Sequence, residues 1–281
     1  MTKPIQTTSR EPYLDQASFH SMLSFRQDEA IPDLRSALAE EDIAPENLGY
    51  VKRQMFDHLW DVTLLLFSGG QKVDKIRPHL QEAIDAFENV IEDEHAPLEY
   101  VDLAIQTYYV EALWLLSLTK LLGLGDQQIE RVANFYAADE TNDGADELFE
   151  VLLAKLGRTS YPAEGLIHED PYQLLLDCIK AEPDHRPALM TEFLKRWFKG
   201  QKECDWWGSH IPRKGTTVLD TGFFGYWAFE AALVTYLWDI DDSTYRDLPH
   251  YPKDLIDYAR DNFQKNGSSN APKLRSNVLA G

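Results

Sequence analysis

Cysteine and positive charge are both scarce in this chain of 281 residues. The two cysteines, Cys178 and Cys204, cannot supply the disulfide framework that is typical of small secreted domains. Only 27 lysines and arginines stand against 47 aspartates and glutamates, which gives a net charge of −20. Because binding to phosphate depends on lysine and arginine, this balance argues against direct binding to nucleic acid.

Apolar runs of membrane-spanning length are missing as well. A transmembrane helix needs about 20 consecutive apolar residues, and every apolar run in this chain is shorter. The first residues, MTKPIQTTSREP, also lack the basic-then-apolar pattern of a secretory signal. We therefore expect a soluble, cytoplasmic protein that does not contact a membrane.

The motifs of common catalytic and metal sites are absent. The eight histidines form no HExxH motif, and no histidine or cysteine pair has zinc-ligand spacing. There is no GxSxG elbow, no P-loop and no GxGxxG after a strand. These absences favour a binding protein without a metal or cofactor over an enzyme.

Helical periodicity dominates the pattern of apolar residues. Most of them recur with the 3.6-residue period of a helix, and strand-like alternation is nearly absent. This predicts an all-α fold, a multi-helix bundle of about ten helices in two packed halves. Pro32 predicts a break in the first helical stretch. The expected segments are a flexible N-terminus at 1–12, an acidic helical half at 13–157, a C-terminal helical half at 158–263 and a disordered tail at 264–281.

Most of the negative charge lies between residues 82 and 150. This stretch holds 17 acidic side chains and only two basic ones, Lys120 and Arg131. Clustered like charges repel one another, and a cationic partner would offset that repulsion. The alternative is a solvated turn with acidic residues that favour a helix N-terminus. On the first interpretation, the predicted contact residues for a basic partner are Glu92, Asp93, Glu94, Asp139, Glu140, Asp143, Asp146 and Glu147.

A second feature is the stretch from Thr221 to Trp238, whose one ionisable side chain is Glu230. If the whole stretch is helical, it is apolar on every side and lies inside the protein. Glu111 is embedded in a similar run, YYVEALWLLSL. A buried carboxylate must be paired, hydrogen-bonded or neutral. Glu230 or Glu111 is therefore either a structural group in the core or a proton-transfer group.

The motifs GYWxFEAA, IDDS and HYPKDL follow one another from Gly225 to Leu255. Together they closely resemble the C-terminal signature of the PoNi immunity proteins, which bacteria carry beside PoNe-type DNase toxins, many of them delivered by type VI secretion. The signature is expected to form core structure and not the contact surface. Its residues in this chain include Tyr226, Trp227, Glu230, Asp241, Asp242 and Tyr251.

Two functions from different classes follow. The resemblance implies an immunity protein of interbacterial competition, which binds and neutralises a cognate DNase toxin, and the acidic charge independently suggests a partner with a basic surface. The alternative is a hydrolase that uses Glu230 or Glu111 as a buried acid or base.

Overall fold

The computed structural model describes residues 9–40, 43–212, 214–216 and 221–264, and this part of the chain is helical without a single strand. The prediction of an all-α fold is confirmed. Most of the expected flexible N-terminus and nearly all of the expected tail lie outside the described residues. The helices are α1 (Gln16–Ser24), α2 (Ile31–Ala39), α3 (Pro45–Ser68), α4 (Val73–Ile91), α5 (Gln106–Leu121), α6 (Asp126–Tyr136), α7 (Glu147–Lys155), α8 (Glu169–Lys180), α9 (Arg186–Gly200), α10 (Phe229–Leu237) and α11 (Lys253–Ala259).

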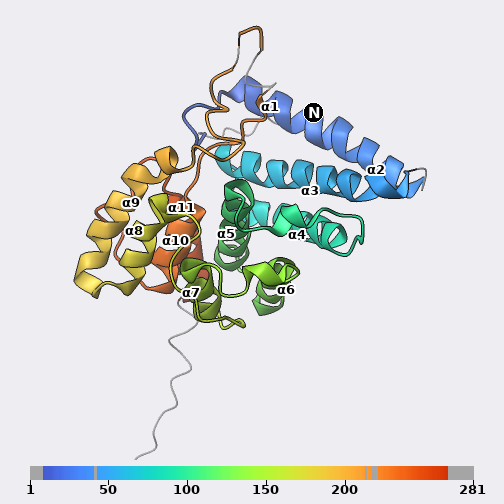
Figure 1. Cartoon of the computed structure of the whole chain (residues 1–281). Coiled ribbons are helices and arrows are strands. Elements are labelled where there is room, and N and C mark those ends of the chain that lie inside the picture. Colours follow the sequence, from blue (N-terminus) through green and yellow to red (C-terminus); the bar gives the residue numbers. More distant parts are fainter. Residues whose placement is uncertain (1–8, 41–42, 213, 217–220, 265–281) are drawn as a thin grey trace, which may run out of the picture.

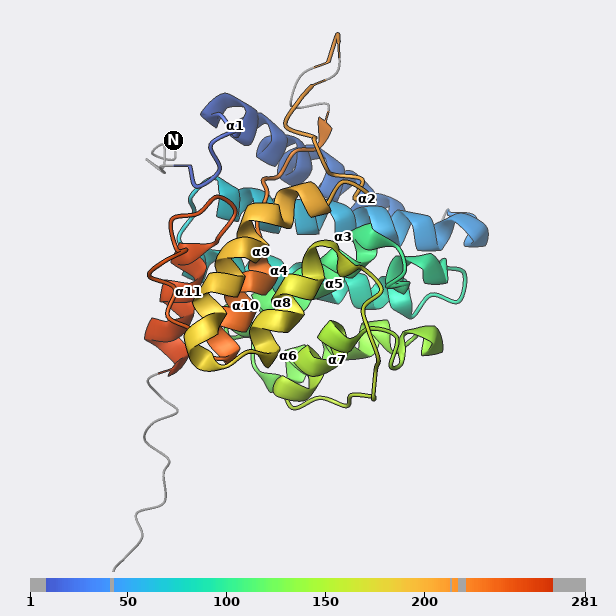
Figure 2. The same ribbon diagram turned by 60° about the vertical axis from the view of Figure 1, so that its left-hand side comes forward.

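The helices pack in two groups that share one core. In Figure 1, α1 and α2 follow one another along α3, and α4 runs beside α3. The helices α8 and α9 form a second pair, which the view of Figure 2 brings to the front. Helix α5 contacts α10, and α11 contacts both α4 and α5. A single cluster of buried apolar side chains runs through both groups, so the halves are packed against each other.

The central position of α5 and α10 follows from their composition. All residues of α5 from Tyr109 to Thr119 are buried, and so is α10 from Phe229 to Thr235. A helix that is apolar on all sides is stable only when other elements surround it. Helix α4 is different, because its buried residues recur every three or four positions and its other face meets solvent.

Aspartate side chains fix two helix starts. The carboxylate of Asp15 accepts a hydrogen bond from Ser18 N at 2.9 Å, and that of Asp146 accepts one from Phe149 N at 2.8 Å. Each satisfies a backbone donor that has no partner within its helix.

The predicted break at Pro32 is wrong. Helix α1 continues into α2 through a π-helical turn at Phe25–Ala30. In this turn Ile31 N bonds to Arg26 O, five residues back. Pro32 is the second residue of α2 and directly follows this π-helical turn. The wider turn therefore lets the chain remain helical through the proline.

Of the apolar stretch from Thr221 to Trp238, only Phe229–Leu237 is helical. The preceding segment bends at Gly225, which has a φ of 106°, a conformation that favours glycine. A Cβ atom at Gly225 would lie 2.2 Å from Ser68 Oγ at the end of α3. Ser68 Oγ donates to Phe224 O at 2.5 Å and accepts from Trp227 Nε1 at 2.8 Å. These contacts with α3 hold the segment in a non-helical path.

Candidate functional site

The carboxylate of Glu230 is fully buried and accepts three hydrogen bonds. One oxygen accepts from Trp197 Nε1 at 2.5 Å and Tyr172 OH at 3.4 Å, and the other accepts from Trp114 Nε1 at 3.1 Å. Burial raises the pKa of Glu230 to about 7. Because α10 meets α5, α8 and α9 at this point, the carboxylate joins four helices. Its position is that of a core group with no exposed surface.

The second buried carboxylate, Glu111, holds a buried arginine. Glu111 accepts two hydrogen bonds from Arg53, at 3.1 and 2.7 Å, and Asp57 accepts a third at 2.8 Å. Burial raises the pKa of Glu111 to about 7, and the charge of Arg53 opposes that rise. The guanidinium also lies 4.9 Å from the ring centre of Tyr100 and 5.1 Å from that of Tyr108. A paired and stacked guanidinium of this kind is well compensated for its loss of water.

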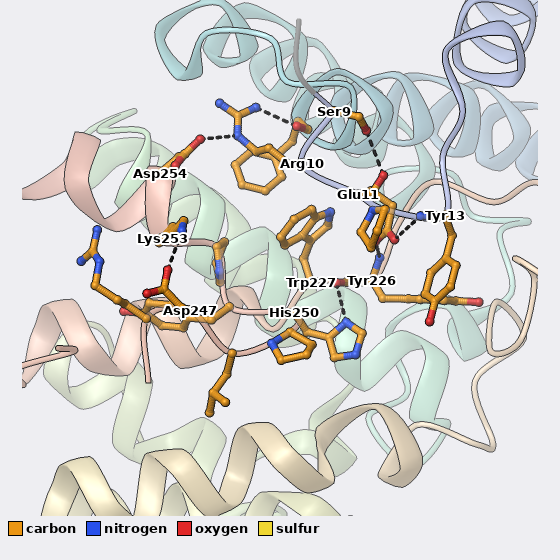
Figure 3. Close-up of a pocket in the computed structure, with 17 residues that line it drawn as sticks. Ser9, Arg10, Glu11, Tyr13, Tyr226, Trp227, Asp247, His250, Lys253 and Asp254 are labelled. Atoms are coloured by element: carbon orange, nitrogen blue, oxygen red, sulfur yellow. Dashed lines mark hydrogen bonds and ion pairs between the residues drawn. The ribbon is translucent and has the colours of Figure 1, made fainter. Parts of the chain in front are cut away.

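The signature segment meets the start of the described chain at a cavity of about 540 Å³ with a mixed apolar and charged lining. Figure 3 shows Glu11 beside Tyr226 and Trp227, with His250 next to them. The buried carboxylate of Glu11 accepts hydrogen bonds from Tyr226 N at 3.0 Å and from Tyr13 N at 3.1 Å. These bonds attach the N-terminal segment to the signature.

A ring of ion pairs borders the same cavity. Arg10 pairs with Asp254 at 2.8 Å and also donates to Phe67 O and Gln71 O. Lys253 pairs with Asp247 at 2.6 Å. The charges around the opening are therefore already matched within the chain.

The adjacent aspartates of the IDDS motif have different surroundings. Asp242 is buried and accepts from Arg260 at 2.8 Å, Arg246 at 3.0 Å and Tyr251 OH at 3.2 Å. It therefore links the helical turn after α11 to the loop before that helix. Asp241 is exposed and accepts from Ser243 N at 2.9 Å, which closes a turn. Apart from Asp241, the predicted signature residues are buried in the core.

The three predicted contact residues at the end of α4 differ in exposure. Glu92 and Glu94 are exposed, whereas the side chain of Asp93 is only 3% exposed. Asp93 pairs with Lys52 at 2.7 Å and accepts from His95 N at 2.9 Å. Its charge is thus used to fix the loop after α4, and we leave Asp93 out of the surface proposed below.

The predicted contact residues between Asp139 and Glu147 also differ in exposure. Glu140 and Asp143 are exposed and Asp139 is half-buried. Asp146, in contrast, is buried and accepts from Tyr109 OH, Phe149 N and Ile167 N at 2.8 to 3.0 Å. Both oxygens of Asp146 thus have partners inside the fold, and we leave Asp146 out of the surface proposed below. Glu147 is half-buried and pairs with Lys180 at 2.6 Å.

One asparagine brings the two acidic groups toward each other. Asn142 donates to Val101 O at 2.9 Å and accepts from Leu103 N at 3.2 Å. The turn at 139–143 therefore lies against the segment that follows the end of α4, where Glu99 is exposed and Asp102 is half-buried. We call this combined surface the acidic face; it consists of Glu92, Glu94, Glu99, Asp102, Asp139, Glu140 and Asp143.

Two exposed apolar side chains beside the acidic face were missed by the sequence analysis. Tyr50 is 58% exposed and Leu98 is 64% exposed. The absence of a Cβ at Gly49 lets α3 approach Ala96 closely, because such an atom would lie 2.8 Å from Ala96 Cα. This approach places Tyr50 next to the 96–100 segment. Exposed aromatic residues often anchor protein interfaces, but neither residue has a spacing in the sequence that would mark it.

Among the described residues, no group of three or more histidine, cysteine, aspartate or glutamate side chains is arranged to hold a metal ion. Within the same part of the chain, every helix is too short or too polar to cross a bilayer.

Comparisons with known proteins agree with this architecture. Residues 10–134 match the family description "PoNe immunity protein (PoNi), N-terminal", and residues 144–255 match "PoNe immunity proteins (PoNi), C-terminal". The crystal structure of protein PA2201 from Pseudomonas aeruginosa has a similar fold, with a TM-score of 0.69 and 20% sequence identity over 91% of this chain and 92% of that chain. No curated protein matches the chain.

Proposed function

The chain belongs to the PoNe immunity protein (PoNi) family, and we propose that it neutralises a cognate DNase toxin by covering the toxin's DNA-binding surface with the acidic face. Members of this family are immunity proteins and not enzymes, which removes the hydrolase alternative for Glu230 and Glu111. The proposed place of action is the cytoplasm, where an incoming toxin, for example one delivered by type VI secretion, meets DNA.

The chemistry of the partner supports this choice of surface. A DNase must present lysine and arginine to the phosphates of DNA. An acidic protein can occupy the same cations, exclude DNA and accelerate its own binding by long-range attraction.

The observation that carries the proposal is the pair of hydrogen bonds that Asn142 makes with Val101 O and Leu103 N, which holds the 139–143 turn against the segment that follows α4. Glu92 and Glu94 come from the end of α4, and Glu140 and Asp143 come from the turn after α6. These four side chains are exposed, and none of them forms an ion pair within the described part of the chain. Their mutual repulsion is relieved when a cationic surface binds. The exposed Tyr50 and Leu98 beside them offer apolar contacts for the same partner.

Reversing these charges should slow binding to the toxin. We expect the acidic-face variant to associate at least about tenfold more slowly at low salt, with the difference shrinking as salt screens the charges. Stopped-flow mixing of the purified protein with the toxin encoded beside it measures this rate, and growth rescue on co-expression measures protection. The variant combines Glu92→Lys, Glu94→Lys, Glu140→Lys and Asp143→Lys.

A matched control separates the surface from net charge. It reverses four exposed acidic residues that lie on α2, the turn before it and the turn before α9, and it should bind nearly as fast as the unchanged protein. Both variants should keep the helical circular dichroism of the parent. Equal slowing in the two variants would show that net charge alone steers the toxin, and unchanged binding in the acidic-face variant would contradict the proposal. The control combines Glu29→Lys, Asp33→Lys, Glu182→Lys and Asp184→Lys.

A further inference from the structure

Beside the acidic face, a cavity of about 410 Å³ opens between α3, α5 and the segment after α9. Aromatic rings form much of its lining. Trp114 stacks on Trp206 with ring centres 5.4 Å apart, and the edge of Phe224 completes this side at 6.1 Å from Trp114. Tyr108 lines another side, and the exposed Tyr50 also lines the cavity. Aromatic faces carry the partial negative charge that attracts cations.

Carboxylates line the same cavity in excess over cations. Helical spacing places Asp57 and Asp61 of α3 one turn apart, and both line the cavity together with Glu111 of α5. Glu99 and Asp205 also line it, and both are exposed. Neither Glu99 nor Asp205 forms an ion pair within the described residues.

The positive charges near the cavity are already committed. Arg53 is held by Glu111 and Asp57, as described above. Arg26 pairs with Asp61 at 2.5 Å. Once these pairs are formed, Glu99 and Asp205 remain as uncompensated charges in an aromatic cavity. Such a site attracts one more cation and offers it both carboxylate and π-face contacts.

The surroundings of Arg53 show that this part of the fold accommodates a guanidinium. Its carbon lies 4.8 to 5.6 Å from the ring centres of Phe56, Phe87, Tyr100 and Tyr108, while carboxylates accept its N–H groups. Tyr108 belongs to both this arrangement and the lining of the cavity. The cavity repeats the same chemistry but is open to an outside group.

We propose that this cavity receives the side chain of a single lysine or arginine from the DNA-binding surface of the toxin. Glu99 belongs both to the acidic face and to the cavity, so the two surfaces are continuous. The inference rests on the proposed function, because it names the part of the toxin that the immunity protein grips. The acidic face then sets the rate of encounter, and the cavity slows dissociation.

The test is a set of double-mutant cycles between the two proteins. The cavity variant Glu99→Gln with Asp205→Asn keeps the shape of both side chains and removes two charges. Its matched control is Glu182→Gln with Asp184→Asn, which removes two exposed charges elsewhere. Each is measured against the toxin and against single alanine substitutions of every lysine and arginine on the toxin's DNA-binding surface.

We expect the cavity variant to raise the dissociation constant about tenfold, mainly through faster dissociation, with the control unchanged. At one toxin position, alanine substitution should weaken binding to the unchanged immunity protein. The same substitution should cause little further loss of affinity for the cavity variant. Equal melting temperatures of the two variants and the parent would exclude a folding defect. Additive effects at every toxin position, or an unchanged dissociation rate, would overturn the inference while leaving the proposed function in place. Failure of the unchanged protein to bind the toxin would overturn both.

Discussion

Replacing Arg53 with methionine should lower the free energy of unfolding by about 3–5 kcal/mol, the usual cost of breaking a buried ion pair by removing one partner. In the native fold Glu111 is 7% exposed and bonds to Arg53 through both oxygens. Without the guanidinium, Glu111 must either remain charged in a poorly solvated site or take up a proton. The stacking of Arg53 on Tyr100 and Tyr108 is lost as well. Urea denaturation followed by circular dichroism measures the change.

A second substitution shows whether the lost pairing is the cause. In Arg53→Met combined with Glu111→Leu, the buried carboxylate is removed together with its partner, and only the half-buried Asp57 loses its bond to Arg53. Much of the stability should therefore return. The double variant should therefore be more stable than Arg53→Met alone. If both variants unfold at the same urea concentration, the damage comes from lost packing around the arginine and not from the stranded charge.

Replacing Glu230 with alanine should cost about 3–5 kcal/mol, because it leaves a cavity and several buried donors without an acceptor. The indole N–H groups of Trp114 and Trp197 and the hydroxyl of Tyr172 all point at this carboxylate. Glu230→Gln is the milder change, with an expected cost of about 1–3 kcal/mol, since its amide N–H₂ would face an indole donor. Thermal and urea unfolding of the two variants show which of them is the less stable.

The same carboxylate makes the cost of Glu230→Gln depend on pH. Burial raises the pKa of Glu230 in the folded protein to about 7, above its ordinary value of 4.5. Between pH 4.5 and pH 7, Glu230 holds a proton in the folded chain that it has released in the unfolded chain. This proton uptake stabilises the folded state fully below about pH 4.5, and the stabilisation is lost as the pH rises through 7. Glutamine does not titrate. The stability gap between the parent and Glu230→Gln should therefore narrow from pH 5 to pH 8. A constant gap across this range would show that Glu230 does not hold its proton in the folded state.

The sequence was sufficient for the helical class and for the central helices. The runs around Glu111 and Glu230 have no polar face, and helices without a polar face must be buried wherever the rest of the chain lies. The start of α10 at Phe229 could not be predicted, because its cause is distant in sequence. Gly225 takes its bend to fit against Ser68, 157 residues earlier, and no local pattern reports that contact.

For the candidate site too, the sequence does not report contacts between residues that are far apart in the chain. Counting charges located the region, yet it could not separate Glu92 from Asp93 or Asp143 from Asp146. Asp93 is neutralised by Lys52 and Asp146 bonds to Tyr109, partners that lie 41 and 37 residues away. Which acidic residues stay exposed and unpaired therefore depends on contacts between distant parts of the chain. The aromatic cavity was out of reach for the same reason, since its lining comes from three separate parts of the chain.

The bond between Glu11 and Tyr226 joins residues that are 215 positions apart. At a translation rate of about 5–20 residues per second, the ribosome needs about 10–40 s to add the second partner after the first. Until then the buried site of Glu11 cannot form, and the signature segment that closes the core is missing. The chain thus completes this part of its core only after Tyr226 has been synthesised. Under the proposed function, a cell that meets the toxin is protected by molecules that were finished before the attack, and each new molecule arrives with this delay.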